Sequence, residues 1–397
     1  MVDPQEFVLG VNYWPIKKAI YWWKLFDIHE VKEDFQRIAE CGLKVVRIFL
    51  LWEDFQPEPQ AVSAAALHNL VAVADTASEC GLYILPTLFC GHMSGANWMP
   101  EWMLGKASLR GRFPVVSNGR VQNREILNYY GDEELIQAQR LLCRQVAKAL
   151  RQHPAVWAYD LGNEASNCVV PPDRHSGRRW LETMAEELRQ ASEGCLVTFG
   201  MHAEDLEEDR RLGPEDAAPF CDFLCMHGYP FYLKWADNPL DAKVLPFLGE
   251  ITRWLGGKPV LFEEFGLHGL LLAHEKSEEE RDELFARYFQ EALELLWERG
   301  MTGAFIWCYG DYHPTLWDKP PLKDNPHERH FGLFNYDGSP KPVVALIRSW
   351  SKQPRHCRRS KPEAATWLEG EKREEFYANP LNNLVNLYQK FKKTIKN

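Results

Sequence analysis

Eight short segments rich in β-branched and aromatic residues alternate along this chain with longer segments of helical periodicity. The alternation indicates a parallel sheet whose strands are joined by crossover helices. Eight strand–helix units in a chain of 397 residues predict a closed (β/α)8 barrel, the TIM barrel, rather than an open doubly wound sheet, and no strand leads into a GxGxxG turn. The predicted strands are 7–14, 44–52, 82–89, 156–164, 195–202, 223–230, 259–266 and 303–311.

Amphipathic segments between these strands are predicted to be helices. In the first of them Val31, Phe35 and Ile38 share one face, and Gly42 marks its C-terminal end. The predicted helices are 29–41, 64–80, 133–152, 177–193, 240–255 and 279–299.

Two long segments without helical periodicity, 90–132 and 311–336, are predicted to be βα loops that wall a pocket over the barrel. After residue 352 the sequence becomes charged and polar, with one helical pattern at 380–393. We therefore expect a catalytic barrel over 1–352 and a short C-terminal helical extension, 353–397, that packs on the barrel.

Composition narrows the range of partners and compartments. A formal net charge of −10 and a pI of about 5.8 weigh against nucleic acid as a partner, because a polyanion would be repelled. Ten cysteines without zinc-like or disulfide-like spacing indicate a reducing compartment. No signal-peptide pattern and no apolar run long enough for a transmembrane helix are present. We expect a cytoplasmic protein with no membrane partner, and the sequence leaves its oligomeric state open.

Two glutamates end strands that are otherwise apolar. Glu164 directly follows Asn163 at the end of the fourth predicted strand, and Glu264 lies near the end of the seventh. Each glutamate alone could be half of a structural salt bridge, for instance with Arg47. Together they lie across the mouth of a barrel from each other, at the strand ends where barrel enzymes carry their chemistry. Retaining glycoside hydrolysis needs two carboxyl groups about 5–5.5 Å apart.

Five motifs at predicted strand ends resemble those of glycoside hydrolase family 5, which belongs to clan A of the retaining β-glycosidases. They are "VVRIF", "GNE", "MHGYP", "EEFG" and "FIWCYGD", on strands two, four, six, seven and eight. The resemblance covers roughly residues 10–345. It implies that Glu164 is the acid/base and that Glu264, which precedes the aromatic-Gly pair, is the nucleophile.

The same resemblance implies a set of substrate-binding residues. Asn163 would hold the sugar 2-hydroxyl, and Arg47 would keep the nucleophile ionised. Tyr229 would lie beside the nucleophile with His227 on the same strand, and Trp307 would floor the innermost sugar site. His92, after the third strand, matches a position where family 5 enzymes often have a site-lining histidine or asparagine.

Further residues are candidates for sugar contacts because of their place at strand ends or in the long loops. Ordinary packing is the alternative for the tryptophans, although a chain with 15 Trp is well suited to stacking on sugars. The histidines of the 311–336 segment match no zinc spacing, so we expect no metal and no cofactor. These additional candidates are Trp14, Trp98, Tyr309 and Asp311.

The expected environment assigns a charge state to each glutamate. Glu264, beside Arg47 and Tyr229, is expected to have a lowered pKa, and Glu164 a raised pKa so that it starts protonated. Glu263 is expected to point away from the site, because neighbouring residues of a strand face opposite sides.

The segments "VNYWP" and "YWW" look most like the bacterial β-mannosidase branch of family 5. We therefore predict a retaining, exo-acting β-mannosidase that cleaves short β-linked oligosaccharides or glycosides by double displacement. An endo-β-mannanase, a β-glucosidase and a β-galactosidase are alternatives, the last because "GVNYWP" and "RIFLLWEDFQPEP" also resemble clan A family 42.

Two other classes fit the residues less well. A non-catalytic carbohydrate-binding barrel would be expected to lack Glu164, Glu264 or Arg47. A metal-dependent barrel hydrolase would be expected to carry His-x-His on its first strand, where this chain has Asn12, Tyr13 and Trp14.

Overall fold

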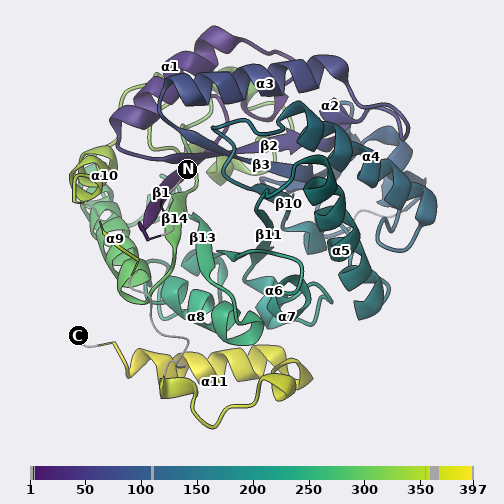
Figure 1. Cartoon of the computed structure of the whole chain (residues 1–397). Helices are drawn as coiled ribbons and strands as arrows, with labels where there is room; N and C mark the ends of the chain where they lie inside the picture. The colour runs from purple at the N-terminus through teal and green to yellow at the C-terminus, as the bar shows by residue number, and fades with distance from the viewer. Residues whose placement is uncertain (1–2, 4, 109–110, 354, 358–365, 396–397) are drawn as a thin grey trace.

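Eight parallel strands close into a barrel at the centre of the molecule (Figure 1). The computed structural model describes residues 3, 5–108, 111–353, 355–357 and 366–395. The strands run around the barrel in the order β1, β14, β13, β12, β11, β10, β3, β2, and β2 pairs with β1. They are β1 (Val8–Tyr13), β2 (Val45–Leu51), β3 (Tyr83–Cys90), β10 (Tyr159–Asn163), β11 (Val197–His202), β12 (Leu224–His227), β13 (Val260–Phe265) and β14 (Gly303–Ile306). The predicted TIM barrel is confirmed; each predicted segment contains one of these strands, except that 82–89 stops one residue before the end of β3.

Helices form an outer ring around the strands (Figure 1). One of them, α10, was not predicted, because it is only nine residues long and begins directly after Pro342. The longer helices of this ring are α1 (Ile28–Glu40), α3 (Ala64–Glu79), α4 (Glu133–Ala149), α5 (Arg174–Ala191), α8 (Val244–Gly256), α9 (Glu278–Glu298) and α10 (Val343–Ser351). Three short helices follow two of the strands: α2 (Trp52–Phe55) follows β2, and α6 (Glu204–Glu207) and α7 (Pro214–Ala217) follow β11.

The sequence determines where these helices begin. Asp27 caps α1 by accepting a hydrogen bond from the His29 backbone N–H. At α9, Ser277 and Glu280 form a reciprocal capping box. Such caps satisfy backbone donors that would otherwise lack partners, so the helices begin at fixed positions relative to the strands.

Two layers of different chemistry fill the inside of the barrel. One is a separate apolar cluster made by strand residues, consisting of Val8, Val45, Leu85, Ala158, Phe223, Cys225, Leu261 and Phe305. The other consists of fully buried polar residues nearer the C-terminal ends of the strands, namely Asn12, Arg47, Thr87, Asp160 and Glu263. Polar groups this deep must be paired with one another, and this layer forms the base of the site described below.

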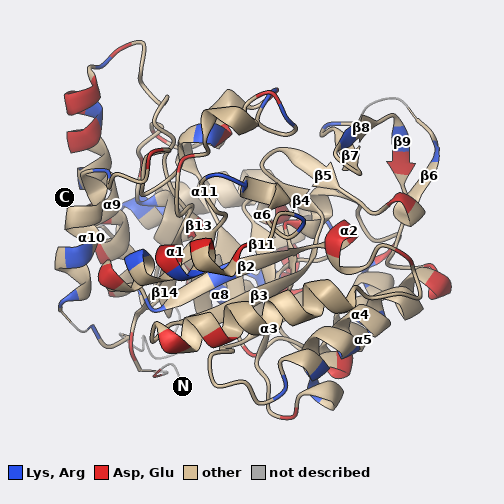
Figure 2. Ribbon diagram, turned by 90° about the horizontal axis from the view of Figure 1, so that it is seen from above, with Lys and Arg blue, Asp and Glu red and all other residues tan. Residues whose placement is uncertain are grey.

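The segment 90–132 is not simply a loop. It forms one sheet from β4 (His92–Met93), β5 (Ala96–Trp98), β7 (Val115–Ser117) and β8 (Arg120–Gln122), and a pair from β6 (Leu104–Ala107) and β9 (Arg124–Ile126). Asn118 and Gly119, both with positive φ, make the tight turn between β7 and β8. The Asn-Gly pair was therefore a hairpin signal. These small strands gather on the side of the molecule away from α9 and α10 (Figure 2).

The C-terminal helix α11 (Pro380–Lys392) lies outside the ring of helices, next to α8 (Figure 1). It buries Leu384, Leu387, Tyr388 and Phe391, and the Tyr388 hydroxyl donates to Asp241. Just before it, a 3-10 turn at Arg373–Ala378 brings the Tyr377 hydroxyl within 2.9 Å of the Asp205 carbonyl oxygen.

All ten cysteines are free thiols. Over the part of the chain that the structure describes, every helix is too short or too polar to cross a membrane.

Candidate active site

A pocket of about 490 Å³ opens over the C-terminal ends of the barrel strands. Its volume lies in the range typical of small-ligand sites. The pocket wall contains seven of the residues predicted from the sequence: His92, Asn163, Glu164, His227, Tyr229, Glu264 and Trp307.

Arg47 lies beneath this pocket and is completely buried. Its Nη1 donates to Glu264 Oε1 at 2.5 Å, and its Nη2 donates to Asn163 Oδ1 at 3.0 Å. Nη2 also donates to Asp160 Oδ2 at 2.7 Å, and Nε donates to Thr87 Oγ1 at 2.9 Å. A guanidinium without water is stable only when it is paired in this way. Arg47 therefore fixes Glu264 and Asn163 relative to each other.

Each carboxylate oxygen of Glu264 has its own donor. Oε1 accepts from Arg47, and Oε2 accepts from the Tyr229 hydroxyl at 2.9 Å. The carboxylate is thereby held in one orientation at the edge of the pocket, as a nucleophile requires.

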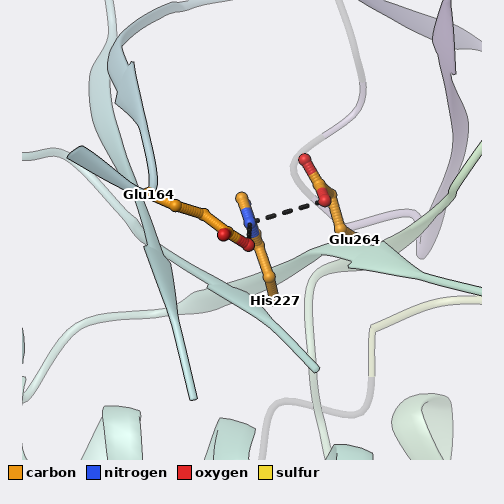
Figure 3. Close-up of side chains that lie close together, drawn as sticks. All are labelled: Glu164, His227 and Glu264. Carbon is orange, nitrogen blue, oxygen red and sulfur yellow. Dashed lines mark hydrogen bonds and ion pairs between the residues drawn. The ribbon is translucent and has the colours of Figure 1, made fainter. Parts of the chain in front are cut away.

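Glu164 directly follows β10 in the left-handed region, with φ 46° and ψ 43°. This conformation is unfavourable for a residue with a side chain, and such residues are concentrated at functional sites. Glu164 Oε1 lies 3.0 Å from His227 Nδ1, and Oε2 accepts from Asn167 Nδ2 at 3.1 Å. Figure 3 shows the His227 ring between the carboxylates of Glu164 and Glu264, with Nδ1 3.6 Å from Glu264 Oε2.

The two glutamates are close enough to act on one bond. One carboxylate oxygen of Glu164, one of Glu264 and one ring nitrogen of His227 all lie within 4.8 Å of one another. Carboxyl groups about 5–5.5 Å apart suit attack by one of them, whereas the inverting mechanism needs a wider gap for water. The arrangement therefore fits the geometry of retention. A metal ion could also be held by three such atoms, but Glu264 is already paired with the Arg47 cation.

The pKa shifts of the glutamates in this structure are the reverse of the expected ones. Burial raises the pKa of Glu164, but the charges of His202, His227 and His92 outweigh burial and hold it below its usual range. Burial raises the pKa of Glu264 above its ordinary 4.5, in spite of His227 and Arg47. The expectation was wrong because it took no account of the histidines around Glu164, which come from separate strands and loops.

Glu263 was expected to point away from the site, and this too is corrected. Its Oε2 lies 3.1 Å from His227 Nε2, and its Oε1 lies 3.3 Å from Arg47 Nε. The strand pairing shifts register between Phe262 and Phe265. A bulge of this kind interrupts the alternation of faces, so both glutamates point inward.

Four predicted sugar contacts lie away from the pocket. Trp14 is fully buried and stacks on Phe49, and the Trp98 indole donates to the Met93 carbonyl. The Tyr309 hydroxyl donates to Asp34, and Asp311 pairs with Lys341. Tyr309 and Asp311 lie outside the pocket because the chain after Trp307 runs beside β1, where the Tyr309 N–H donates to the Asn12 carbonyl. Contacts within the fold therefore account for all four: packing and a backbone hydrogen bond for the tryptophans, a hydrogen bond for Tyr309 and an ion pair for Asp311.

Sequence reasoning missed Asp160 and His202. Asp160 is a lone acidic residue within an otherwise apolar strand segment, as Arg47 is a lone cation within one. His202 is the polar last residue of β11, the same signal that identified Glu164. Both residues were therefore recognisable from the pattern.

Contacts between loops enclose the pocket. Arg112 pairs with Glu204, and the Trp235 indole donates to Glu207 at 2.6 Å. The Tyr232 hydroxyl lies 2.7 Å from His327 Nε2. Finally, Asn325 Nδ2 donates to the Ser94 carbonyl at 3.3 Å, which joins the loop after β14 to the loop after β3. The loops after β1 and β2 lie outside this set of contacts and supply no lining residue among those described.

Comparison with known proteins gives the class of fold and site. No protein-family model matches the chain. A protein of Aspergillus terreus named "Probable mannan endo-1,4-beta-mannosidase A-2" is 24% identical over 243 residues, which is 58% of this chain and 56% of that protein. The chain thus matches little more than half the length of this curated relative.

Solved structures match over more of the chain. GH5_18 from Streptomyces cattleya in complex with Manβ1-4GlcNAc has a TM-score of 0.73 at 21% identity, covering 87% of this chain and 80% of that one. Exo-β-1,4-mannosidase Op5Man5 from an Opitutaceae bacterium has a TM-score of 0.71 at 26% identity, covering 87% and 59%. The fold is that of the glycoside hydrolase barrels. The expected resemblance to glycoside hydrolase family 5 is confirmed by these neighbours.

Proposed function

We propose that this chain is a retaining glycoside hydrolase that removes a terminal β-linked mannose from short oligosaccharides. The observation that carries the proposal is the pair Glu164 and Glu264, with carboxylate oxygens within 4.8 Å, each held by its own set of donors.

The chemistry follows from these positions. A carboxylate oxygen of Glu264 attacks the anomeric carbon, the bond to the leaving oxygen breaks, and that oxygen takes the proton of Glu164. Water then attacks the anomeric carbon, its proton passes to Glu164, and the bond to Glu264 breaks. The product keeps the β configuration because the carbon is inverted twice.

Exo action is supported by the enclosure of the pocket. The contact between Asn325 and Ser94 joins the loops after β14 and β3, and β1 and β2 lie between these two strands in the ring. An enclosed pocket accommodates the end of a chain, whereas attack within a polymer needs an open groove.

Mannose as the sugar is supported by the names of similar proteins, which include a mannan endo-1,4-β-mannosidase, an exo-β-1,4-mannosidase and a complex with Manβ1-4GlcNAc. An endo-β-mannanase, a β-glucosidase and a β-galactosidase are the alternatives. A reducing compartment such as the cytoplasm is supported by ten free cysteines.

The test is a panel of nitrophenyl β-mannoside, β-glucoside and β-galactoside, together with Manβ1-4GlcNAc and polymeric β-mannan. We expect the mannoside and the disaccharide to be cleaved and the polymer to be left nearly intact. Activity on the polymer with none on the small glycosides would overturn exo action. Preference for another glycoside would overturn the sugar assignment.

Variants separate the two roles. Glu264→Gln should abolish turnover of every substrate while the thermal transition stays two-state. Glu164→Gln should slow the disaccharide by about 10²–10⁴-fold and the nitrophenyl glycoside less, because a phenolate leaves without a full proton transfer. Glu182→Gln, on the exposed face of α5, is the matched control and should behave as wild type. Normal turnover by Glu264→Gln would overturn the proposed mechanism.

A further inference from the structure

His202 is a buried histidine of the pocket wall, 7% exposed, whose two ring nitrogens have different surroundings. Its Nδ1 lies 2.9 Å from Asp205 Oδ2, and its backbone N–H donates to the same oxygen at 3.0 Å. The other oxygen of Asp205 accepts from the Ser166 hydroxyl at 2.6 Å. Asp205 is thereby fixed, and it holds the imidazole ring in one orientation.

The second nitrogen, Nε2, is buried and has no hydrogen-bond partner among the residues that the structure describes. The Glu204 carboxylate approaches it only to 3.6 Å, which is beyond hydrogen-bond range, and Glu204 is engaged by Arg112 and Arg210. Burial lowers the pKa of His202, but Asp205, Glu164 and Glu204 raise it to about 10. Nε2 therefore carries a proton at neutral pH and forms a long ion pair with Glu204, but its buried N–H lacks a hydrogen-bond acceptor, which disfavours the empty site.

The position of His202 indicates which part of a substrate would meet this donor. The sugar that Glu264 attacks must lie over Glu264 and Trp307, on the β13 and β14 side of the pocket. Glu164, after β10, protonates the oxygen that leaves. His202 ends β11, the strand between β10 and β12, and its charge acts on the acid/base Glu164 of the neighbouring β10. Because His202 lines the pocket next to the strand of the group that protonates the leaving oxygen, we expect Nε2 to meet the leaving group.

We propose that His202 Nε2–H donates a hydrogen bond to an oxygen of the leaving-group sugar, and so makes the enzyme select a sugar leaving group over a simple aryl group. This inference rests on the proposed glycosidase function and deepens it. Asp205 acts as the positioning residue, because it fixes both the proton on Nδ1 and the direction in which Nε2 points.

The test compares two substrates that share the attacked sugar, Manβ1-4GlcNAc and nitrophenyl β-mannoside. In His202→Ala, kcat/KM for the disaccharide should fall about 10- to 100-fold, as expected for the loss of a charge-assisted hydrogen bond, and that for the aryl mannoside by less than about threefold. The ratio of the two values does not depend on the folded fraction of the preparation. A destabilised variant therefore still gives a clear answer.

Two further variants complete the design. His202→Gln keeps an N–H donor without the charge and should recover part of the lost preference for the disaccharide. His68→Ala removes an exposed histidine of α3 and should leave both rates unchanged.

Failure of this inference can be distinguished from failure of the proposed function. Equal losses on both substrates in His202→Ala would mean that His202 acts through its charge on Glu164, and would overturn this inference alone. A wild-type protein that cleaves neither substrate would overturn the proposed function together with it. If the panel reveals another sugar, the same pair of leaving groups on that sugar is used.

Discussion

His227 sits among three carboxylates, with Nδ1 3.0 Å from Glu164 and Nε2 3.1 Å from Glu263. Burial lowers its pKa, but Glu264, Glu164 and Glu263 raise it to about 9. The empty site therefore keeps a proton on His227, with Glu164 ionised. Transfer of this proton along the 3.0 Å contact gives the state that hydrolysis needs, with Glu164 protonated. The neutral ring stays anchored because its Nε2–H still donates to Glu263.

A pH dependence follows. The folded-state pKa of His227 lies above the ordinary 6.5, so the stabilisation from its charge is complete below pH 6.5 and is lost as the pH rises through about 9. Glu164 loses its proton source over the same rise. We expect the alkaline limb of kcat/KM against pH to have an apparent pKa near 9. An alkaline limb whose apparent pKa is near the ordinary pKa of a histidine would contradict this role of His227.

At the scale of residues, the sequence predicts which residues form the site better than it predicts the charge state of each. Glu164 and Glu264 were recognisable because each ends an apolar strand, and Arg47 because it is a lone cation within one. The direction of their pKa shifts was not predictable. It depends on His92, His202 and His227, whose distances from Glu164 are set by the closed barrel.

At the scale of elements, the ends of β13 and β14 approach each other directly beneath the pocket. A Cβ added to Gly266 would lie 2.2 Å from the Trp307 carbonyl oxygen. Only glycine allows this approach, which holds the nucleophile strand against the tryptophan that floors the pocket.

Gly266→Ala should therefore force the two strand ends apart. We expect a loss of about 1–3 kcal/mol in the free energy of unfolding and a fall in kcat larger than the fall in folded protein. Urea unfolding and activity on one preparation measure both. Gly111→Ala, where an added Cβ meets nothing within 4 Å, is the control. If the two variants have equal stability, the close approach is not needed.

Helices and strands with strong local periodicity in the sequence could be predicted, whereas those with weak periodicity could not. The barrel strands were identified because each is a compact apolar run with a polar end. The small strands β4–β9 were not, since two to four residues carry too little periodicity to be recognised. The bulge in β13 also left no local signal, because it arises from pairing with β12 and β14.

At the scale of the whole molecule, the C-terminal helix is part of the same structure as the barrel. Its Lys392 contacts Asp237, and its Tyr388 packs on Trp235, whose indole holds Glu207 at the pocket. Tyr377 reaches the carbonyl of Asp205, which orients His202. We therefore expect the extension and the barrel to unfold together.

Leu384→Ala tests this coupling, because Leu384 is fully buried in α11. The variant should lower the free energy of unfolding of the whole chain by about 2–5 kcal/mol. Leu381→Ala, on the same helix but 48% exposed, should change it by less than about 0.5 kcal/mol. Loss of activity and tryptophan fluorescence should follow one urea transition. A barrel transition that is the same in both variants would contradict the coupling.

Closure of the barrel between β1 and β14 also sets when the site can exist during synthesis. Arg47 leaves the ribosome long before Glu263 and Glu264, so its guanidinium stays solvated until the carboxylates that neutralise it have been synthesised. We expect the complete site to form only when the ring closes, because Arg47 and Glu264 lie on β2 and β13, and β14 closes the ring between β13 and β1. We therefore expect chains that stop before Gly303 to leave the edges of β1 and β13 unpaired and open to aggregation, because β14 pairs with both.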